Sequence, residues 1–171
     1  ITDAATLATL LKYDSTYGVW GHEVRGGEGA LHVDETRIDI TAEKDPSQLP
    51  LRDKEVDVVI EATGKFRKRQ DAQKHIDAGA RKVLITAPPK SAIDGNFVLG
   101  VNADQYDPQK HDIISIGSCT TNCLAPVAKV LHDELGIEHG LMTTVHAYTA
   151  SQNLLDGPHK DMRRARSAAD N

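Results

Sequence analysis

The chain has 171 residues, of which 39% are hydrophobic and 26% are charged, and its formal net charge is −5 at pH 7. This length allows one domain with a sizeable core or parts of two. The acidic balance argues against a general nucleic-acid binder, and no apolar stretch approaches the roughly 20 residues that span a membrane. Two cysteines four positions apart, without a glycosylation sequon, indicate a reducing compartment and predict a cytoplasmic location.

The first part of the chain is expected to combine one helix with short strands. A helical pattern begins at Thr2 and runs to about Tyr13. Alternating segments at residues 32–33 and 37–41 follow a glycine-rich stretch, which predicts antiparallel strands joined by loops. Residues 45–50 contain two prolines and are expected to form a loop.

The middle of the chain alternates strands with a helix. Residues 56–63 form a dense apolar run, typical of a strand in a parallel sheet that is covered on both faces. A helix predicted at residues 69–78 and a second buried strand at 82–86 complete a βαβ unit. The runs 97–101 and 113–117 supply two further strands. The fold class is therefore predicted to be an open α/β sheet.

Open α/β sheets bind ligands beyond the carboxyl ends of their strands. The predicted strand ends carry glycines and small polar residues at Thr63 and Gly64, at Thr86, and at residues 117–119. Such residues also make ordinary turns, but the presence of a cysteine among them favours a shared cleft. The dinucleotide fingerprint G-x-G-x-x-G does not occur in the chain, so a nucleotide site is expected to need residues that precede Ile1.

Cys119 is placed like a nucleophile. It lies between a predicted core strand at residues 112–117 and a helical pattern at residues 124–135. Unpaired backbone N–H groups and the positive end of a helix dipole favour the reactive thiolate. A lone cysteine is often only a packing residue, and with Cys123 it could form a redox pair or half of a metal site. Zinc motifs usually need two more nearby ligands, so no metal site is predicted.

His146 is the leading candidate for the base that a catalytic cysteine needs. It follows a predicted strand at residues 141–145 and would lie at the carboxyl end of that strand. A single histidine in such a place is more often structural, but the pairing with a cysteine at a helix N-terminus favours catalysis. Most of the other histidines have a surface-helix or loop setting, and His132 lies beside two carboxylates on an expected solvated face.

Hydroxyl and basic side chains near these two residues are suited to an anion. Ser118 and Thr120 flank the cysteine, and Thr149 follows His146 by three positions. Hydroxyls at a helix N-terminus bind anions such as phosphate, although each could serve only as a helix cap. The basic run at residues 156–166 is an exposed loop, the lining of an anionic ligand site, or a subunit contact.

Three segments together resemble the phosphorylating glyceraldehyde-3-phosphate dehydrogenase family. They are SCTTNCLAP at residues 118–126, HAYT at 146–149 and DGPHKDMRRAR at 156–166. The separation of cysteine and histidine also fits. Further segments agree in order, at residues 11–15, 61–66 and 100–102, so the resemblance covers essentially the whole chain.

The resemblance implies a partial Rossmann-type dinucleotide-binding domain at residues 1–118, without its first strand and glycine fingerprint. The start of an α+β catalytic domain would follow at residues 119–171 and include the family's S-shaped loop. Ile1 is not a start residue and the last residues carry no stop signal, so we expect an internal piece of a longer chain. The complete protein is expected to be a homotetramer.

The resemblance also implies oxidation and phosphorylation of D-glyceraldehyde 3-phosphate with NAD. Cys119 would attack the aldehyde, His146 would activate the thiol and accept the proton, and inorganic phosphate would cleave the resulting thioester. Positions that contact the substrate phosphate or the attacking phosphate match Ser118, Thr120, Thr149 and Arg164. The wall of the cofactor pocket matches Thr63, Gly64, Phe66 and Thr86.

Lys44 is a further predicted cofactor contact, because it replaces an arginine that is common before Asp-Pro in the family. Pro158 is compatible with NAD and leaves NADP open, since the residue that decides at the ribose would precede Ile1.

Two other functions remain open at this point. A semialdehyde dehydrogenase would apply the same cysteine and histidine chemistry to another substrate, although Thr149 and the basic run favour a phosphorylated one. The second alternative is a truncated fragment without catalytic activity. Loss of the half of the domain that carries the glycine fingerprint would remove most of the affinity for the cofactor. The isolated chain is then expected to show no NAD-dependent turnover.

Overall fold

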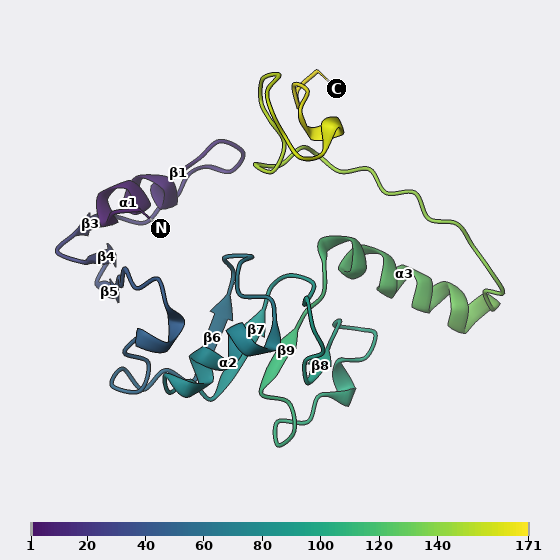
Figure 1. Cartoon of the computed structure of the whole chain (residues 1–171), viewed down its shortest axis with the longest axis horizontal. Helices are drawn as coiled ribbons and strands as arrows, with labels where there is room; N and C mark the ends of the chain where they lie inside the picture. The colour runs from purple at the N-terminus through teal and green to yellow at the C-terminus, as the bar shows by residue number, and fades with distance from the viewer. Residues whose placement is uncertain (1, 171) are drawn as a thin grey trace. The chain divides into compact units, whose positions relative to one another are not determined.

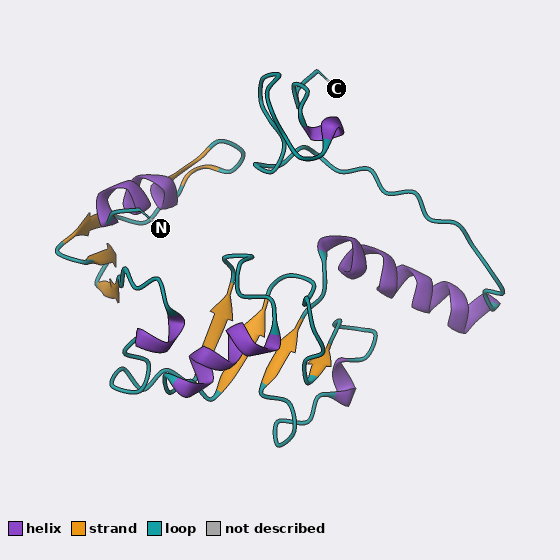
Figure 2. Ribbon diagram, viewed as in Figure 1, coloured by secondary structure: helices purple, strands orange, loops and turns teal. Residues whose placement is uncertain are grey.

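The computed structural model describes residues 2–170, and the chain divides into two compact units, Ile1–Pro126 and Val127–Asn171. Every strand found in residues 2–170 lies in the first unit, and the strands are coloured orange in Figure 2. The division falls within helix α3 (Cys119–Leu135). Within residues 2–170, no helix combines the length and apolarity that a bilayer crossing requires.

The first helix and the antiparallel strands predicted after it are both present. Helix α1 begins after Asp3, whose side chain accepts a 2.9 Å hydrogen bond from the backbone N–H of Thr6. The hydrogen bonds from Thr6 stabilise the carboxylate and lower the pKa of Asp3 to about 2. The elements of this part are α1 (Ala4–Lys12), β1 (Tyr13–Asp14), β2 (Gly18–Val19), β3 (Val24–Gly27), β4 (Ala30–Val33) and β5 (Thr36–Asp39).

Gly26 allows strand β3 to lie directly against helix α1. A Cβ atom at this position would stand 2.0 Å from the backbone oxygen of Ala4. Strands β3, β4 and β5 form one antiparallel sheet, in which His32 lies opposite Arg37. The pairing confirms the antiparallel arrangement expected from the alternating pattern.

The predicted βαβ unit is also confirmed. Strand β6 (Val58–Glu61), helix α2 (Arg69–Asp77) and strand β7 (Lys82–Ile85) follow one another, and β6 pairs with β7 in parallel. Strand β9 (Ile113–Ser115) pairs in parallel with β7 and with the short β8 (Gly95–Asn96), which gives the order β6-β7-β9-β8. The described part of the chain also contains the single-turn 3₁₀ helices η1 (Pro46–Gln48), η2 (Ala103–Gln105) and η3 (Met162–Arg164).

The core lies between helix α2 and the parallel sheet. Figure 1 shows α2 crossing one face of β6 and β7. Ala72 of α2 is fully buried against Val83, Ile85 and Ile113, which come from the two central strands. The small alanine lets the helix approach the sheet closely, and burial of the three branched side chains removes their apolar surface from water.

Replacement of Ile113 by alanine is expected to lower the free energy of unfolding by about 2–5 kcal/mol, because it leaves a cavity among fully buried neighbours. Urea denaturation of the chain, followed by circular dichroism, measures this change. Leu99→Ala is the control, since Leu99 is 84% exposed, and it should shift the value by less than about 0.5 kcal/mol. Equal effects of the two variants would contradict this description of the core.

The strand predicted at residues 97–101 is wrong. Strand β8 ends at Asn96, and the backbone N–H groups of Val101 and Asn102 donate to the carbonyl of Val98, at 3.1 and 3.2 Å. The side chain of Asn102 in turn accepts a 2.8 Å bond from the N–H of Val98. An asparagine that bonds to the backbone of its own loop competes with strand pairing, and the apolar pattern alone does not show this.

The strand predicted at residues 141–145 is wrong as well. These residues are exposed and take no strand conformation, and none of the sheets in residues 2–170 includes them. A strand forms only where a neighbouring strand pairs with its N–H and C=O groups. The prediction is wrong because the local sequence does not determine whether such a partner is present.

Candidate active site

Cys119 is the first residue of helix α3 and is exposed. The helix starts five residues earlier than its apolar pattern predicts. Ser118 explains the early start, because its Oγ accepts a 3.0 Å hydrogen bond from the backbone N–H of Thr121 and lies 2.8 Å from the hydroxyl of Thr121. This bond is that of a helix N-cap. The structure therefore confirms that the thiol lies where a core strand leads into a helix.

Asn122 holds the loop between β9 and α3, and sequence reasoning gave it no role. Its Nδ2 donates to the backbone oxygens of Ile116 and Ser118, at 2.7 and 2.8 Å. Below it, the buried Ser115 Oγ accepts a 3.0 Å bond from the N–H of Gly117. These bonds fix the backbone on the N-terminal side of Cys119. In the sequence, the signal for this role of Asn122 is its position one turn after the capping residue Ser118.

This arrangement suits an anion. The first backbone N–H groups of a helix lack intrahelical partners, and the dipole is positive at this end. Cys119 is exposed at this end of the helix, so an anion that approaches the thiol meets these groups. Thr120, the other hydroxyl residue beside the thiol, is half-buried in the first turn.

In the second unit, three predicted site residues share one cavity. The cavity has a volume of about 500 Å³ and includes His146, Thr149 and Arg164. Its remaining lining residues are Ala147, Ser151, Gln152, Asp161 and Arg163. Residues that lie up to 18 positions apart in the chain thus face a common space that contains two guanidinium groups and two hydroxyls.

Ser151 links Thr149 to Arg164. The Ser151 hydroxyl lies 2.9 Å from the Thr149 hydroxyl and accepts a 3.1 Å bond from Arg164 Nη1. The imidazole Nε2 of His146 lies 2.8 Å from the hydroxyl of Thr144. A guanidinium group beside two hydroxyls is well suited to the oxygens of a phosphate.

Asp161 compensates part of the positive charge of the cavity. Its carboxylate accepts bonds of 3.1 Å from the backbone and side chain of Arg163, and it lies 3.7 Å from Arg164 Nε. The hydrogen bond from the Arg163 side chain, together with that from its backbone, lowers the pKa of Asp161. The carboxylate is therefore ionised at neutral pH and orients both arginines.

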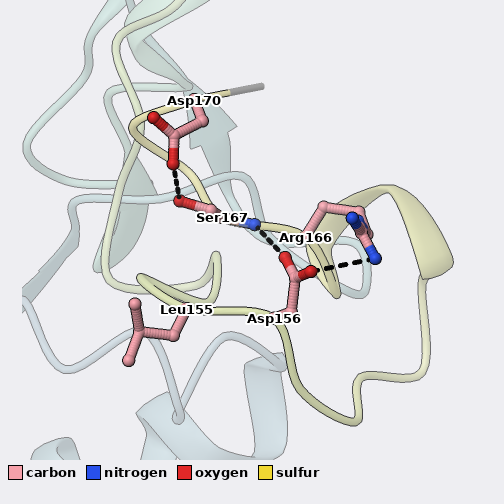
Figure 3. A pocket seen from close by; sticks show the side chains of 5 residues that line it. All are labelled: Leu155, Asp156, Arg166, Ser167 and Asp170. Carbon is pink, nitrogen blue, oxygen red and sulfur yellow. Dashed lines mark hydrogen bonds and ion pairs between the residues drawn. The ribbon is translucent and has the colours of Figure 1, made fainter.

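Another arginine of the basic run, Arg166, pairs with an acidic residue of the same segment. Figure 3 shows a second cavity of the same unit, of about 420 Å³, where Arg166 pairs with Asp156 at 2.9 Å. Asp156 also accepts a 2.9 Å bond from the N–H of Ser167. Arg166 is thus held in an ion pair, whereas Arg164 lines the cavity that contains His146.

The predicted cofactor residues lie at one edge of the parallel sheet. Thr63 and Gly64 follow β6, and Thr86 follows β7, so these residues lie at the carboxyl ends of parallel neighbours. These three are exposed, and Phe66 is half-buried. Gly64 has φ +71°, a conformation that favours glycine, and no atom lies within 4 Å of where its Cβ would stand. An open, polar edge of this kind fits a dinucleotide.

Comparisons with known proteins agree with this geometry. Residues 1–69 match the model of the glyceraldehyde 3-phosphate dehydrogenase NAD binding domain, and residues 118–171 match that of the C-terminal domain of the same family. The chain belongs to the glyceraldehyde 3-phosphate dehydrogenase family. The resemblance seen in the sequence is confirmed, as is a fold made of a partial Rossmann-type domain and the start of a C-terminal domain.

Several curated family members are similar over the whole chain. Glyceraldehyde-3-phosphate dehydrogenase of Geobacillus stearothermophilus is 55% identical over 170 residues, which are 99% of this chain and 50% of that protein. The Kitasatospora aureofaciens protein is 56% identical over 171 residues, 100% of this chain and 51% of that protein. Glyceraldehyde-3-phosphate dehydrogenase 1 of Bacillus subtilis (strain 168) is 53% identical over the same length. The chain spans about half the length of these relatives.

In this member of the family, the predicted site residues form separate groups. Ser118 caps α3, which begins with Cys119 and Thr120 in the first compact unit, while His146 lines a cavity of the second. The pairing of the thiol with the imidazole therefore stays a prediction. Lys44 is exposed in a bend of the first unit, and its contact with the cofactor also stays a prediction, as does a domain boundary after residue 118.

Proposed function

We propose that the complete protein is a phosphorylating glyceraldehyde-3-phosphate dehydrogenase of glycolysis or gluconeogenesis. It would oxidise D-glyceraldehyde 3-phosphate with NAD and inorganic phosphate to give 1,3-bisphosphoglycerate. The observation that carries the proposal is the cavity in which His146 faces the same space as Thr149 and Arg164. A base beside an anion site is what an aldehyde carrying a phosphate group requires.

In the first half of the proposed reaction, the sulfur of Cys119 adds to the aldehyde carbon while His146 accepts the thiol proton and passes it to the aldehyde oxygen, which gives a hemithioacetal. His146 takes the proton of the hemithioacetal hydroxyl while a hydride leaves the same carbon, so that a thioester remains on Cys119. NAD supplies the acceptor for that hydride. The backbone N–H of Cys119 serves as an oxyanion donor.

In the second half, an oxygen of inorganic phosphate attacks the thioester carbon. The carbon–sulfur bond breaks, the Cys119 thiolate is released, and the acyl phosphate leaves. Ser118 and Thr120 at the start of α3, with Thr149 and Arg164 in the second unit, are proposed to hold the phosphate groups. Thr63, Gly64, Phe66 and Thr86 are proposed to line the cofactor pocket, with NADP as an alternative cofactor.

The activity assay that tests this function uses the complete protein. Reduced nicotinamide is expected to form only when D-glyceraldehyde 3-phosphate, NAD or NADP, and inorganic phosphate are all present. A semialdehyde without a phosphate group should be a poor substrate, because Arg164 would have no anion to bind. Turnover of the semialdehyde alone, or no turnover with either cofactor, would overturn the proposal.

Lys44→Ala is expected to weaken cofactor binding several-fold, which corresponds to the loss of one exposed charge contact. The chemical step should be unaffected, because Lys44 has no part in the proposed proton and hydride transfers. Calorimetric titration of the complete protein with NAD measures the Kd. Lys110→Ala, which removes another exposed lysine, is the matched control. An identical Kd in the two variants would show that Lys44 does not take the place of the family's arginine.

We also propose a homotetramer for the complete protein and a cytoplasmic location. The proposal of a tetramer is supported by the similarity of residues 150–171 to the family's S-shaped loop, and light scattering of the complete protein tests it. The cytoplasmic location is supported by Cys119 and Cys123, which are both free thiols.

A further inference from the structure

Two ionisable side chains are buried beneath the predicted cofactor edge. Glu61, the last residue of β6, is 3% exposed, and His75 of α2 is 4% exposed. Glu61 Oε2 lies 3.4 Å from His75 Nε2. Figure 1 shows the two elements that carry them packed together, with α2 against the sheet. The reaction proposed above uses neither residue.

The Glu61 carboxylate holds the turn that follows β6. Its Oε1 accepts a 2.9 Å hydrogen bond from the backbone N–H of Thr63 and a second bond from the Thr63 hydroxyl. That hydroxyl accepts a 3.1 Å bond from the N–H of Lys65. Gly64, with its positive φ, lies between these residues. The conformation of the whole turn therefore depends on one buried carboxylate.

The remaining residues of the predicted cofactor wall contact the same pair. The ring of Phe66 meets the ring of His75 edge-on, with centroids 6.2 Å apart and planes at 88°. Thr86 donates from its backbone N–H and from its hydroxyl to the backbone oxygen of Glu61, at 3.1 and 3.2 Å. Each of these wall residues is thus adjacent to Glu61 or His75, or lies within the turn that Glu61 holds.

Burial of an ionisable pair in a core costs desolvation free energy. Apolar residues of similar volume are often equally stable or more so, and a buried polar atom without a hydrogen bond calls for an explanation. Within residues 2–170, the structure assigns neither ring nitrogen of His75 a hydrogen-bond partner. Burial lowers the pKa of His75, against the opposing attraction of the Glu61 carboxylate, so the ring is neutral at neutral pH.

We propose that Glu61 and His75 are positioning residues for the dinucleotide. They hold the turn at Thr63 and Gly64, and the ring of Phe66, in the binding-competent conformation before the cofactor binds. A wall that is already ordered does not lose conformational freedom on binding, and this increases affinity. The inference rests on the proposed function, since it takes these residues as part of the cofactor pocket.

The binding test compares Glu61→Gln with Asp57→Asn in the complete protein. The neutral amide of Glu61→Gln keeps the volume but weakens the charge-assisted bonds to Thr63. We expect the Kd for NAD, measured by calorimetry, to rise about tenfold. Asp57 lies just before β6, with its side chain 65% exposed in a pair with Arg81, so Asp57→Asn makes the same change of charge outside the core and should leave the Kd unchanged.

A double-mutant cycle separates positioning from general destabilisation. If Glu61 acts through the Thr63 hydroxyl, Thr63→Val combined with Glu61→Gln should raise the Kd no more than the larger single effect. Fully additive effects would contradict the proposal.

Amide hydrogen exchange in the cofactor-free protein gives a second readout that needs no bound NAD. The N–H groups of Thr63 and Lys65 should exchange faster in Glu61→Gln and in His75→Phe than in the wild type, while those of β9 stay protected. If His75→Phe does not fold, Glu61→Gln decides the question, because it is isosteric.

The two proposals fail in distinguishable ways. If the wild-type protein binds neither NAD nor NADP, the proposed function is wrong. If it binds NAD but Glu61→Gln changes neither the Kd nor the exchange of the turn, the function stands and the positioning role is wrong.

Discussion

Replacement of Cys119 by serine in the complete protein is expected to abolish NAD-dependent turnover. Serine keeps the size of the side chain and the N-terminal position in α3, but a hydroxyl is a far weaker nucleophile than a thiolate. Loss of a nucleophile in an enzyme with a covalent intermediate lowers kcat by roughly 10⁴–10⁶-fold. The rate of formation of reduced nicotinamide measures the effect.

Cys123→Ser is the matched control for this experiment. Cys123 is an exposed free thiol one turn further along the same helix, so the variant makes the same chemical change away from the helix N-terminus. It is expected to keep most of the activity. Substantial turnover by Cys119→Ser, or equal losses in the two variants, would contradict the assignment of the nucleophile.

Replacement of His146 by asparagine is expected to slow turnover by roughly 10²–10⁴-fold, which is the usual contribution of a general base. Asparagine retains polar atoms near Thr144, the neighbour of the imidazole Nε2, but it cannot accept a proton at neutral pH. The variant should also slow alkylation of Cys119 by iodoacetamide at neutral pH, because the imidazole would no longer assist loss of the thiol proton. Steady-state kinetics and the alkylation rate are the two measurements.

His139→Asn provides the comparison for the second prediction. His139 is exposed in the same unit and lies outside the lining of the cavity that contains His146. Turnover and alkylation should both match the wild type in this variant. If His146→Asn alkylates as fast as the wild type, the imidazole does not act on the thiol, and its predicted pairing with Cys119 is wrong.

Local patterns predicted most elements of the chain well, with one failure in each compact unit. The apolar run before Glu61 predicted strand β6, and the helical pattern around Ala72 predicted helix α2. The expected cover on both faces of the sheet is wrong for β6, where Val58 and Ile60 are 53% and 64% exposed.

At residues 97–101 and 141–145 the same reasoning was wrong. At residues 97–101, hydrogen bonds within the loop determine the backbone conformation. Residues 141–145 belong to none of the sheets in the described part of the chain. A window of five residues contains neither kind of information.

The burial of His75 has a signal in the sequence. This histidine lies three residues after the fully buried Ala72, on the side of the helical pattern that faces the sheet. A histidine on a core face should prompt a search for its partner. The partner, Glu61, follows an apolar strand, and its role could not be derived from the sequence, because a residue at a strand end can be either exposed or buried.

By itself, the sequence determined the α/β class, the βαβ unit and the place of Cys119 between a strand and a helix. All of these depend on periodicity and capping between residues a few positions apart. The tertiary structure alone decided that Thr149 and Arg164 meet through Ser151 beside His146, and that Glu61 and His75 lie beneath the turn at Thr63. Such groups include residues that are distant in the chain, and only the path by which the chain folds back brings those residues into contact.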